Sequence, residues 1–505
     1  MENKNLSWID RYSYLIGVAA VITYIVAAWF SKGYYHPDEH FQILEFANLK
    51  LGKLSSQDLP WEYAAGMRSS FQPWIAYLSI KGLRLAGCFN PYLQTFFLRL
   101  CTALFAVYSI SCFVKGNMKS IPGNLRLGYV VLSYFLWFLP FINVRFSSEA
   151  WAGLWFLLAV SQIPADRPLT AAEWLKVGIF SGIAFLCRFQ AGFMVLGLLG
   201  WLIIVRKISR KEVGGLVVIW VIIISIGVIL DRLYYGRWVL SVWNYFEANI
   251  LNGAAASFGT MPWYTFIYQR MTAALFPLGM LMALCLLLVL IEDNKSILIW
   301  CVCPLLVCHL IVAHKEVRFL FTVVNFIPLL LIRGVQYSRV YMARVPRILR
   351  KVLGYAFLTI GISANGIALG AAIFLAPSYG RIALTQFVYD HYPIHPVTIY
   401  SLNKDEVNPF VPFAFLRQSF YEMPNVSQKQ IDRYENLKKE MFDNDGVTLL
   451  VFRKYELDNP VLVNKLDQLK FQEVYNGNPD WALNIAGLYF DDLENGEYVI
   501  FGKKL

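Results

Sequence analysis

Residues 213–230 read VGGLVVIWVIIISIGVIL, an apolar run without a charged side chain. A helix of this length spans the hydrocarbon core of a bilayer, so the run predicts a transmembrane helix. Similar runs recur between residues 14 and 376. The whole chain of 505 residues is 57% hydrophobic and only 16% charged, whereas a soluble protein carries about 25% charged residues. The sequence therefore predicts an α-helical polytopic membrane protein.

We predict about eleven membrane segments from the lengths of these runs. The segments lie near residues 14–30, 93–114, 127–144, 149–163, 174–186, 190–205, 213–230, 271–291, 297–313, 319–332 and 352–376. The pair 174–186 and 190–205 has a second interpretation as one long kinked helix. The first segment is too long for the core of a signal peptide and lacks a small-residue cleavage site, so we expect a retained anchor.

Basic residues are concentrated in three short loops between the segments. They are Lys115, Lys119, Arg126, Arg206, Lys207, Arg210, Lys211, Arg333, Arg339, Arg344, Arg347, Arg350 and Lys351. Positive charge marks cytoplasmic loops. An even number of membrane segments separates each of these three loops from the next, so all three lie on the same side of the membrane, as the charge rule requires. The extracytoplasmic face then receives the loops 31–92, 145–148, 187–190, 231–270 and 314–318, and everything after residue 377. This bias explains much of the net charge of +11, and we expect no nucleic-acid partner.

The composition of the chain changes near residue 377. Apolar runs become shorter, charge rises, and strand-like stretches occur at Val447–Arg453 and Glu497–Phe501. We therefore expect a transmembrane catalytic domain over residues 1–376 and a small extracytoplasmic α/β domain over residues 377–505. None of the eight cysteines lies beyond Cys308, so the second domain has no disulfide framework.

The sequence YYHPDEHFQ at residues 34–42 directly follows the first apolar segment. Adjacent carboxylates at a membrane edge are costly to retain and indicate function. Partial desolvation raises the pKa of such a carboxyl group and makes the carboxylate a better proton acceptor. A helix cap is the simpler alternative, because proline and acids suit a first turn, but a cap explains only one acid. The candidate catalytic residues are Asp38 and Glu39, and the candidate substrate ligands beside them are His36, His40 and Gln42.

The sequence HKEVRF at residues 314–319 supplies three candidate cations between two later apolar segments. Arginine binds phosphate in a bidentate manner, and lysine binds it as a point charge. The alternative is that these cations only reach toward the membrane interface. Because the topology places both motifs on one face, we favour an anion site. Its candidate residues are His314, Lys315, Glu316 and Arg318, with Glu149, Arg188 and Gln190 from neighbouring external loops.

The sequence offers no convincing set of metal ligands. Cys301 and Cys303 suit a buried helix, and His391 and His395 have no third ligand nearby. The chain also has no GxGxxG motif and no P-loop, so a nucleotide donor is not indicated. A lipid-phosphate donor fits better, because its departing phosphate needs charge stabilisation rather than a strong acid. We expect activity without a metal or another cofactor.

The two motifs together resemble the signature segments of glycosyltransferase family 22, in the C-type superfamily. The resemblance extends over residues 10–376. This family contains the α-mannosyltransferases of GPI-anchor and N-glycan assembly, which use a lipid-phosphomannose donor. The resemblance implies an inverting transferase with an extracytoplasmic active site. It also implies that Asp38 is the base, with Glu39 beside it, and that His314, Lys315 and Arg318 handle the donor phosphate.

The first motif is most similar to the GPI-anchor branch of this family. Eukaryotic members of the branch often carry a cysteine–histidine segment after the last helices, and this chain has no cysteine there. We therefore favour a bacterial homologue, with a polyprenyl-phosphate sugar donor, a glycan or glycolipid acceptor and a periplasmic active site. A eukaryotic protein would have its active site in the lumen of the endoplasmic reticulum.

Two alternatives to a mannosyltransferase stay open. The first is a polyprenyl-phosphate-dependent transferase of another sugar. The second is a glycolipid transporter or flippase, which needs charges near the bilayer midplane and usually inverted repeats. We find neither feature in the sequence.

Overall fold

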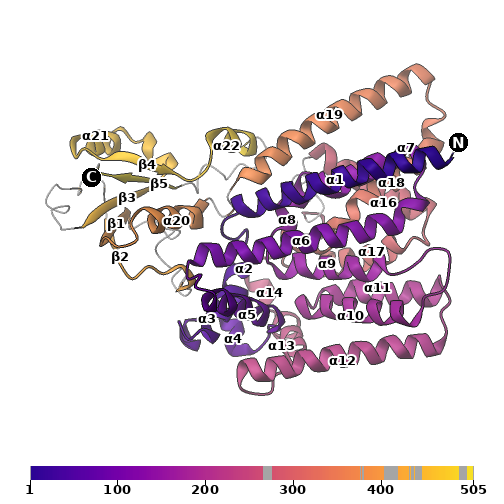
Figure 1. The fold of residues 1–505 in the computed structure, drawn as a ribbon, viewed down its shortest axis with the longest axis horizontal. Helices are drawn as coiled ribbons and strands as arrows, with labels where there is room; N and C mark the ends of the chain where they lie inside the picture. Colours follow the sequence, from indigo (N-terminus) through magenta and orange to yellow (C-terminus); the bar gives the residue numbers. More distant parts are fainter. Residues whose placement is uncertain are drawn as a thin grey trace. The chain divides into compact units, whose positions relative to one another are not determined.

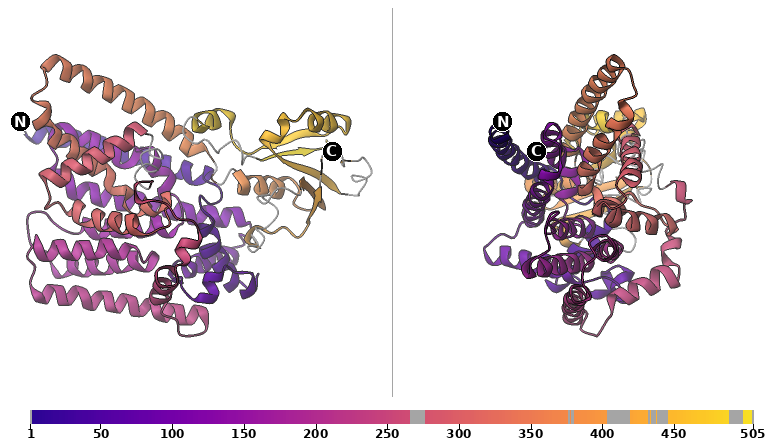
Figure 2. Two further views of the ribbon diagram at one scale, coloured as in Figure 1. Left: turned by 180° about the vertical axis from the view of Figure 1, so that it is seen from behind. Right: turned by 90° about the vertical axis from the view of Figure 1, so that its right-hand side faces the viewer.

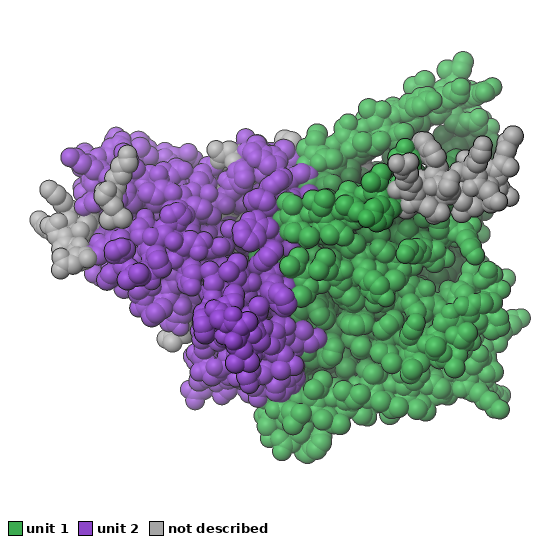
Figure 3. Space-filling model, viewed as in Figure 1, with its two compact units in different colours: residues 1–27, 65–72, 99–369 green, residues 28–64, 73–98, 370–505 purple. Residues whose placement is uncertain are grey.

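The computed structural model describes residues 2–265, 276–375, 377, 380–402, 419–431, 433, 437, 446–487 and 498–503. The chain is mostly helical (Figure 1), and its contacts divide it into two compact units (Figure 3). Unit 1 comprises residues 1–27, 65–72 and 99–369, and unit 2 comprises residues 28–64, 73–98 and 370–505. Most of the predicted external loop 31–92 therefore folds with the C-terminal residues.

The long helices of unit 1 run side by side (Figures 1 and 2). They are α1 (Glu2–Phe30), α6 (Pro91–Asn117), α7 (Gly123–Phe135), α9 (Ser148–Ser161), α10 (Ala171–Cys187), α11 (Ala191–Ile204), α12 (Arg210–Tyr235), α16 (Phe276–Glu292), α17 (Ile297–Ile311), α18 (Ile327–Met342) and α19 (Arg347–Phe374), of which α1, α6 and α19 extend into unit 2. Shorter helical pieces are η3 (Met118–Ser120), α8 (Phe138–Asn143), α13 (Ser241–Phe246), η4 (Glu247–Leu251), α14 (Ala254–Ser257) and the 3₁₀-helix η5 (Val317–Phe326).

Each predicted membrane segment coincides with one of these helices or with two adjoining ones. The segment 127–144 is divided between α7 and α8, and the segment 319–332 between η5 and α18. Residues 174–186 and 190–205 form separate helices, because Arg188 between them is extended (φ −152°, ψ 117°). The interpretation as one kinked helix is therefore wrong. The first residues of the predicted segment 271–291 lie outside the described residues.

Several of the helices are suited to a membrane. Among the described residues, four are long and apolar enough to cross one, and they are Pro91–Ser120, Arg210–Tyr235, Val317–Met342 and Arg347–Phe374. Shorter apolar helices cover Tyr14–Phe30, Ala191–Ile204, Leu278–Glu292 and Ile297–Ile311. The helical membrane class is confirmed, and the larger predicted number of segments stays a prediction.

Helix α12 shows how local sequence sets the limits of one span. Ser209 and Glu212 form a capping box, in which each side chain accepts a hydrogen bond from the other residue's backbone N–H. Gly236, with φ of 72°, ends the helix in the left-handed conformation that glycine adopts without strain. Between these caps, Val218 and Val221 are 58% and 57% exposed. Apolar side chains exposed in this way fit a helix that contacts lipid.

Loops that the charge pattern assigns to the cytoplasmic side also contact one another in unit 1. Arg333 donates hydrogen bonds to the carbonyl and the hydroxyl oxygen of Ser120, at 3.1 and 2.8 Å. Arg206 donates to the carbonyl oxygens of Ala165 and Arg167, at 3.0 and 2.7 Å. These contacts agree with the predicted grouping of the loops, while the side of the membrane stays a prediction.

Unit 2 contains a five-stranded sheet in the order β2-β1-β3-β5-β4. Its strands are β1 (Val397–Leu402), β2 (Val426–Ile431), β3 (Val447–Arg453), β4 (Gln472–Asn476) and β5 (Tyr498–Gly502). Strand β1 pairs in parallel with β2 and β3, and β5 pairs antiparallel with β3 and β4. The predicted strand at 447–453 is β3, and the one at 497–501 is β5, although Glu497 lies outside the described residues. The small C-terminal α/β fold is confirmed.

The remaining elements of unit 2 are helical, and α4 and α5 each cross its boundary with unit 1. They are α2 (Pro37–Glu39), the π-helix η1 (His40–Leu44), α3 (Glu45–Lys50), η2 (Ser56–Asp58), α4 (Trp61–Ala65), α5 (Phe71–Leu85), α20 (Arg381–His391), η7 (Ser419–Tyr421), η10 (Lys454–Asp458), α21 (Pro460–Gln468) and α22 (Asp480–Gly487). Alternate side chains of the sheet are buried on opposite faces, so Leu449 packs with Leu384 of α20, while Leu450 packs with Leu462 of α21.

Hydrogen bonds within unit 2 join its first half to its last. The Tyr92 hydroxyl donates to the Thr385 hydroxyl at 3.1 Å, and Arg381 donates to the Tyr34 hydroxyl at 3.3 Å. All four residues are buried. The segment that carries the first motif is therefore held against α20 of the C-terminal sheet domain.

Candidate active site

The first motif forms a short helix in unit 2 that begins at Pro37. His36 is its N-cap, and the Nδ1 atom of His36 accepts a hydrogen bond from the backbone N–H of Asp38 at 3.3 Å. The same Nδ1 atom lies 3.5 Å from Oδ1 of Asp38, and the Asp38 side chain is 25% exposed. A helix cap is thus present, and His36 supplies it. The Asp38 carboxylate is partly exposed, and its role as the base stays a prediction.

The helix α2 continues directly into a π-helix. The backbone N–H of Glu45 donates to the carbonyl oxygen of His40, five residues earlier in the chain. π-turns are rare in proteins, and those that occur often lie at functional sites. The wider turn buries His40 and Gln42, whereas Asp38 and Glu39 stay partly exposed.

Buried carboxylates hold the two inward side chains of this segment. Nε2 of His40 lies 2.8 Å from Oε1 of Glu45, and Nε2 of Gln42 donates to Oε1 of Glu62 at 3.0 Å. His40 also stacks on Tyr421, with 5.6 Å between ring centroids. These contacts support the segment from behind. Glu45 and Glu62 are not among the predicted site residues, although a glutamate five residues after His40 is the spacing that a π-turn brings together.

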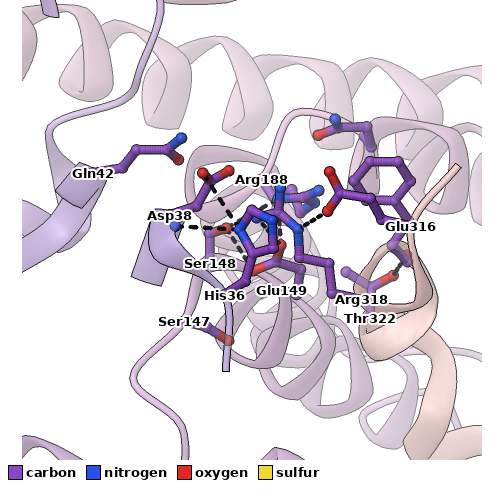
Figure 4. Close-up of polar contacts among 12 residues, drawn as sticks. His36, Asp38, Gln42, Ser147, Ser148, Glu149, Arg188, Glu316, Arg318 and Thr322 are labelled. Carbon is purple, nitrogen blue, oxygen red and sulfur yellow. Dashed lines mark hydrogen bonds and ion pairs between the residues drawn. The ribbon is translucent and has the colours of Figure 1, made fainter. Parts of the chain in front are cut away.

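The second cluster lies in unit 1, where two arginines converge on one carboxylate (Figure 4). Oε1 of Glu149 is 2.8 Å from Nη1 of Arg188 and 3.3 Å from Nη1 of Arg318. The side chains of Arg188, Glu149 and Arg318 are only 5%, 3% and 8% exposed. The Ser148 hydroxyl donates to the other oxygen of Glu149 at 3.0 Å and accepts from Arg188 at 3.1 Å. We call these residues the arginine cluster.

The ends of three elements build the arginine cluster. Glu149 lies in the first turn of α9, Arg188 is the C-cap of α10, and Arg318 lies in the first turn of η5. The approach of η5 to α9 depends on Gly153, because a Cβ atom there would lie 2.7 Å from the carbonyl oxygen of Thr322. The loops 145–148, 187–190 and 314–318, which the topology assigns to one face, thus meet in one place.

Glu316 and His314 extend the arginine cluster. Glu316 accepts a hydrogen bond from Nε of Arg318, and its other oxygen lies 2.7 Å from Nε2 of His314. Nδ1 of His314 lies 3.2 Å from the carbonyl oxygen of Gly259. A neutral histidine has one N–H donor, so its tautomer decides which of these two contacts is a hydrogen bond.

Two further predicted site residues have their described contacts elsewhere. The Lys315 ammonium donates to the carbonyl oxygens of His309 and Leu310, at 3.1 and 3.0 Å, and to that of Val312. Three bonds match the three donors of an ammonium, and they satisfy free carbonyls at the end of α17. Burial lowers the pKa of Lys315. Gln190 donates to the hydroxyl of Tyr245.

In the part of the chain that the structure describes, no group of three or more His, Cys, Asp or Glu residues is arranged to hold a metal ion. His391 instead lies with Nδ1 2.9 Å from the carbonyl oxygen of Phe387, one turn earlier in α20. Activity without a metal stays a prediction. The predicted site residues thus include two buried arginines in contact with one carboxylate and a partly exposed aspartate.

Comparison with known proteins places this chain in a family. The model of the Alg9-like mannosyltransferase family matches residues 15–399, which is well over half of the chain. The chain belongs to the Alg9-like mannosyltransferase family. This match confirms the resemblance to glycosyltransferase family 22.

Curated relatives of the chain include mannosyltransferases of GPI assembly. The chain is 25% identical over 370 residues to GPI mannosyltransferase 3 of Yarrowia lipolytica, covering 70% of this chain and 67% of that protein. It is 22% identical over 333 residues to GPI alpha-1,2-mannosyltransferase 3 of Danio rerio, covering 64% and 60%. It is 25% identical over 323 residues to mannosyltransferase APTG1 of Arabidopsis thaliana, and that match spans only 54% of that protein's length.

A solved structure shares the fold. The crystal structure of ArnT from Cupriavidus metallidurans bound to undecaprenyl phosphate superposes with a TM-score of 0.51 at 11% sequence identity, covering 97% of this chain and 98% of that one. An identity this low shows the fold alone. The chain therefore shares the overall fold of this structure.

Proposed function

We propose that this protein transfers mannose from a polyprenyl-phosphate donor to a glycan or glycolipid acceptor. The observation that carries the proposal is the arginine cluster, in which two buried guanidiniums converge on one oxygen in a membrane protein of a mannosyltransferase family. Arg188 and Arg318 bind the donor phosphate in this proposal, because buried arginines form strong, directed bonds to phosphate oxygens. The names of the GPI mannosyltransferase relatives favour a glycolipid acceptor.

The proposed reaction breaks the bond between C1 of the mannose and the phosphate oxygen. The electron pair stays on the phosphate, so the phosphodiester monoanion becomes a lipid phosphate dianion. The acceptor hydroxyl oxygen forms the new bond to C1 with inversion, and its proton passes to Asp38. Fixed cations stabilise the charge that develops on the leaving phosphate, and such electrostatic stabilisation is often the largest contribution to catalysis. A positioned base contributes about 10²- to 10⁴-fold.

Glu39 is the second candidate for the base, and Gln42 and His40 support the motif in this proposal. The meeting of the acidic motif with the arginine cluster in one active site stays a prediction. So do the extracytoplasmic side of the reaction, and the choice between a periplasmic and a lumenal site.

A donor screen tests the proposed function. Purified protein in lipid nanodiscs would receive dolichyl- and undecaprenyl-phosphate carrying mannose, glucose, an aminosugar or a pentose, with a GPI-type glycolipid acceptor. We expect transfer of mannose and loss of transfer in Arg188→Ala. Transfer of a different sugar would keep the enzyme class and change the substrate. Turnover with none of these donors, together with movement of intact glycolipid between leaflets, would favour the transporter alternative.

A further inference from the structure

The arginine cluster poses an electrostatic problem for an anion site. The contacts join two guanidiniums, of Arg188 and Arg318, to two carboxylates, of Glu149 and Glu316. The two positive and two negative charges of these four groups cancel one another. A phosphate that entered beside these four groups would meet no net positive charge from them. It would also lie close to the buried carboxylate of Glu149 and the partly buried carboxylate of Glu316, which is unfavourable at low dielectric.

The two carboxylates occupy different positions in the arginine cluster. Oε1 of Glu149 contacts both guanidiniums, whereas the oxygens of Glu316 contact Arg318 and His314. A phosphate oxygen bound by both arginines would need the place that this Glu149 oxygen fills. Carboxylate and phosphate oxygens accept from a guanidinium with the same geometry, so each can replace the other there.

We propose that Glu149 is a built-in stand-in for the donor phosphate, which displaces its carboxylate from between Arg188 and Arg318. The inference rests on the proposed function and adds a positioning residue to it. In the empty site Glu149 keeps the two buried arginines aligned and neutralised. After displacement its carboxylate stays at the first turn of α9, where the helix end favours negative charge, and within reach of the Ser148 hydroxyl.

Glu149 also affects release of the product, because its carboxylate competes with the product phosphate for the two arginines. The lipid phosphate that leaves after transfer carries one more negative charge than the donor, so it binds the two arginines more tightly and is released more slowly. Return of the Glu149 carboxylate to the arginines competes with this product. Glu149 thus weakens phosphate binding in order to speed release, and its removal should tighten binding.

The test is the affinity of purified protein for undecaprenyl phosphate, with undecaprenol as the uncharged lipid control. The variant is Glu149→Gln, which keeps the shape of the side chain and removes its charge. We expect affinity for undecaprenyl phosphate to rise about 5- to 150-fold, the usual range of coupling between two groups that affect each other's binding. Multiple-turnover kcat should fall because product release slows, while the rate of a single turnover changes less.

Two control variants separate position from charge. Glu316→Gln removes the same charge from the same cluster without vacating the shared point, so its affinity gain should be clearly smaller. Glu173→Gln removes a partly buried carboxylate that pairs with Arg167 outside the cluster and should leave affinity unchanged. If Glu149→Gln does not fold, Glu149→Asp replaces it as the test variant, because the shorter side chain cannot bridge both arginines. The Glu149→Asp protein should then also bind undecaprenyl phosphate more tightly than the wild type.

The outcomes are distinct. Weaker or unchanged binding by the Glu149 variant, with normal binding by the wild type, overturns the stand-in and leaves Glu149 as a structural partner of the arginines. Equal gains in Glu149→Gln and Glu316→Gln overturn it as well, since charge alone would then explain the result. A wild-type protein that does not distinguish undecaprenyl phosphate from undecaprenol refutes the proposed function itself, and this inference with it.

Discussion

Replacing Gly153 with alanine should lower transfer activity, because the new methyl group meets the backbone that carries Arg318. A Cβ atom at residue 153 would lie 2.7 Å from the carbonyl oxygen of Thr322 and 3.0 Å from its Cα atom. Ordinary van der Waals contact begins at 3.4 Å. The obstacle is backbone rather than a flexible side chain, so α9 and η5 must move apart by about 0.7 Å.

This movement reaches the arginine cluster because Arg318 and Thr322 belong to the same 3₁₀-helix. Nη1 of Arg318 is 3.3 Å from Oε1 of Glu149, and a shift of about 0.7 Å would stretch the contact to about 4 Å, beyond hydrogen-bond distance. Overpacking of this kind costs about 1–3 kcal/mol of folding free energy. A misplacement near 1 Å can lower turnover by about 10²-fold, so we expect a loss of about 10- to 100-fold in Gly153→Ala.

The assay measures mannose transfer and the thermal unfolding midpoint of each purified variant. Gly361→Ala is the matched control, because this glycine of α19 has nothing within 4 Å of a Cβ position. Wild-type turnover and an unchanged midpoint in Gly153→Ala would refute the argued contact between α9 and η5. A similar loss in Gly361→Ala would show that any added methyl group in a helix has the same effect.

The other predictions concern the base, the donor phosphate, the topology and metal independence. Asp38→Asn should keep donor binding and lower turnover by about 10²-fold or more. If Asp38→Asn turned over normally and Glu39→Gln were inactive, the base would be Glu39. If both variants stayed active, the motif would have only its helix-cap role. Arg318→Ala should weaken donor binding as well as turnover. Because it removes one of the two arginines paired with the buried Glu149 carboxylate, it should also destabilise the fold by about 3–5 kcal/mol; unchanged donor affinity and unfolding midpoint would contradict this. A cysteine at Ser338 should resist labelling by a membrane-impermeant reagent from outside, and labelling there would invert the topology. Transfer should survive EDTA, and loss that Mg²⁺ or Mn²⁺ restores would show that carboxylates hold a metal.

The sequence was sufficient for features that depend on neighbouring residues. Apolar runs gave the helices, because a span needs only length and hydrophobicity. The strands β3 and β5 were predicted from short strand-like stretches, and alternate side chains of β3 pack against α20 and α21. The helix cap that the sequence offered as an alternative is present, since proline and acids suit a first turn, but the residue that supplies it is His36, which was predicted as a substrate ligand. The two motifs were sufficient to point to the family.

The tertiary structure decided which charged groups meet, because those contacts join residues far apart in the chain. Glu149, Arg188 and Arg318 come from three loops, and no local rule states that one carboxylate oxygen lies between two guanidiniums. Lys315 lies in the same motif as Arg318, yet its ammonium bonds to carbonyls at the end of α17. A sequence gives the charge of each side chain, whereas burial and direction determine its partner. That is why the sequence predicted an anion site by residue type, and only the folded chain revealed that one oxygen of Glu149 lies between Arg188 and Arg318.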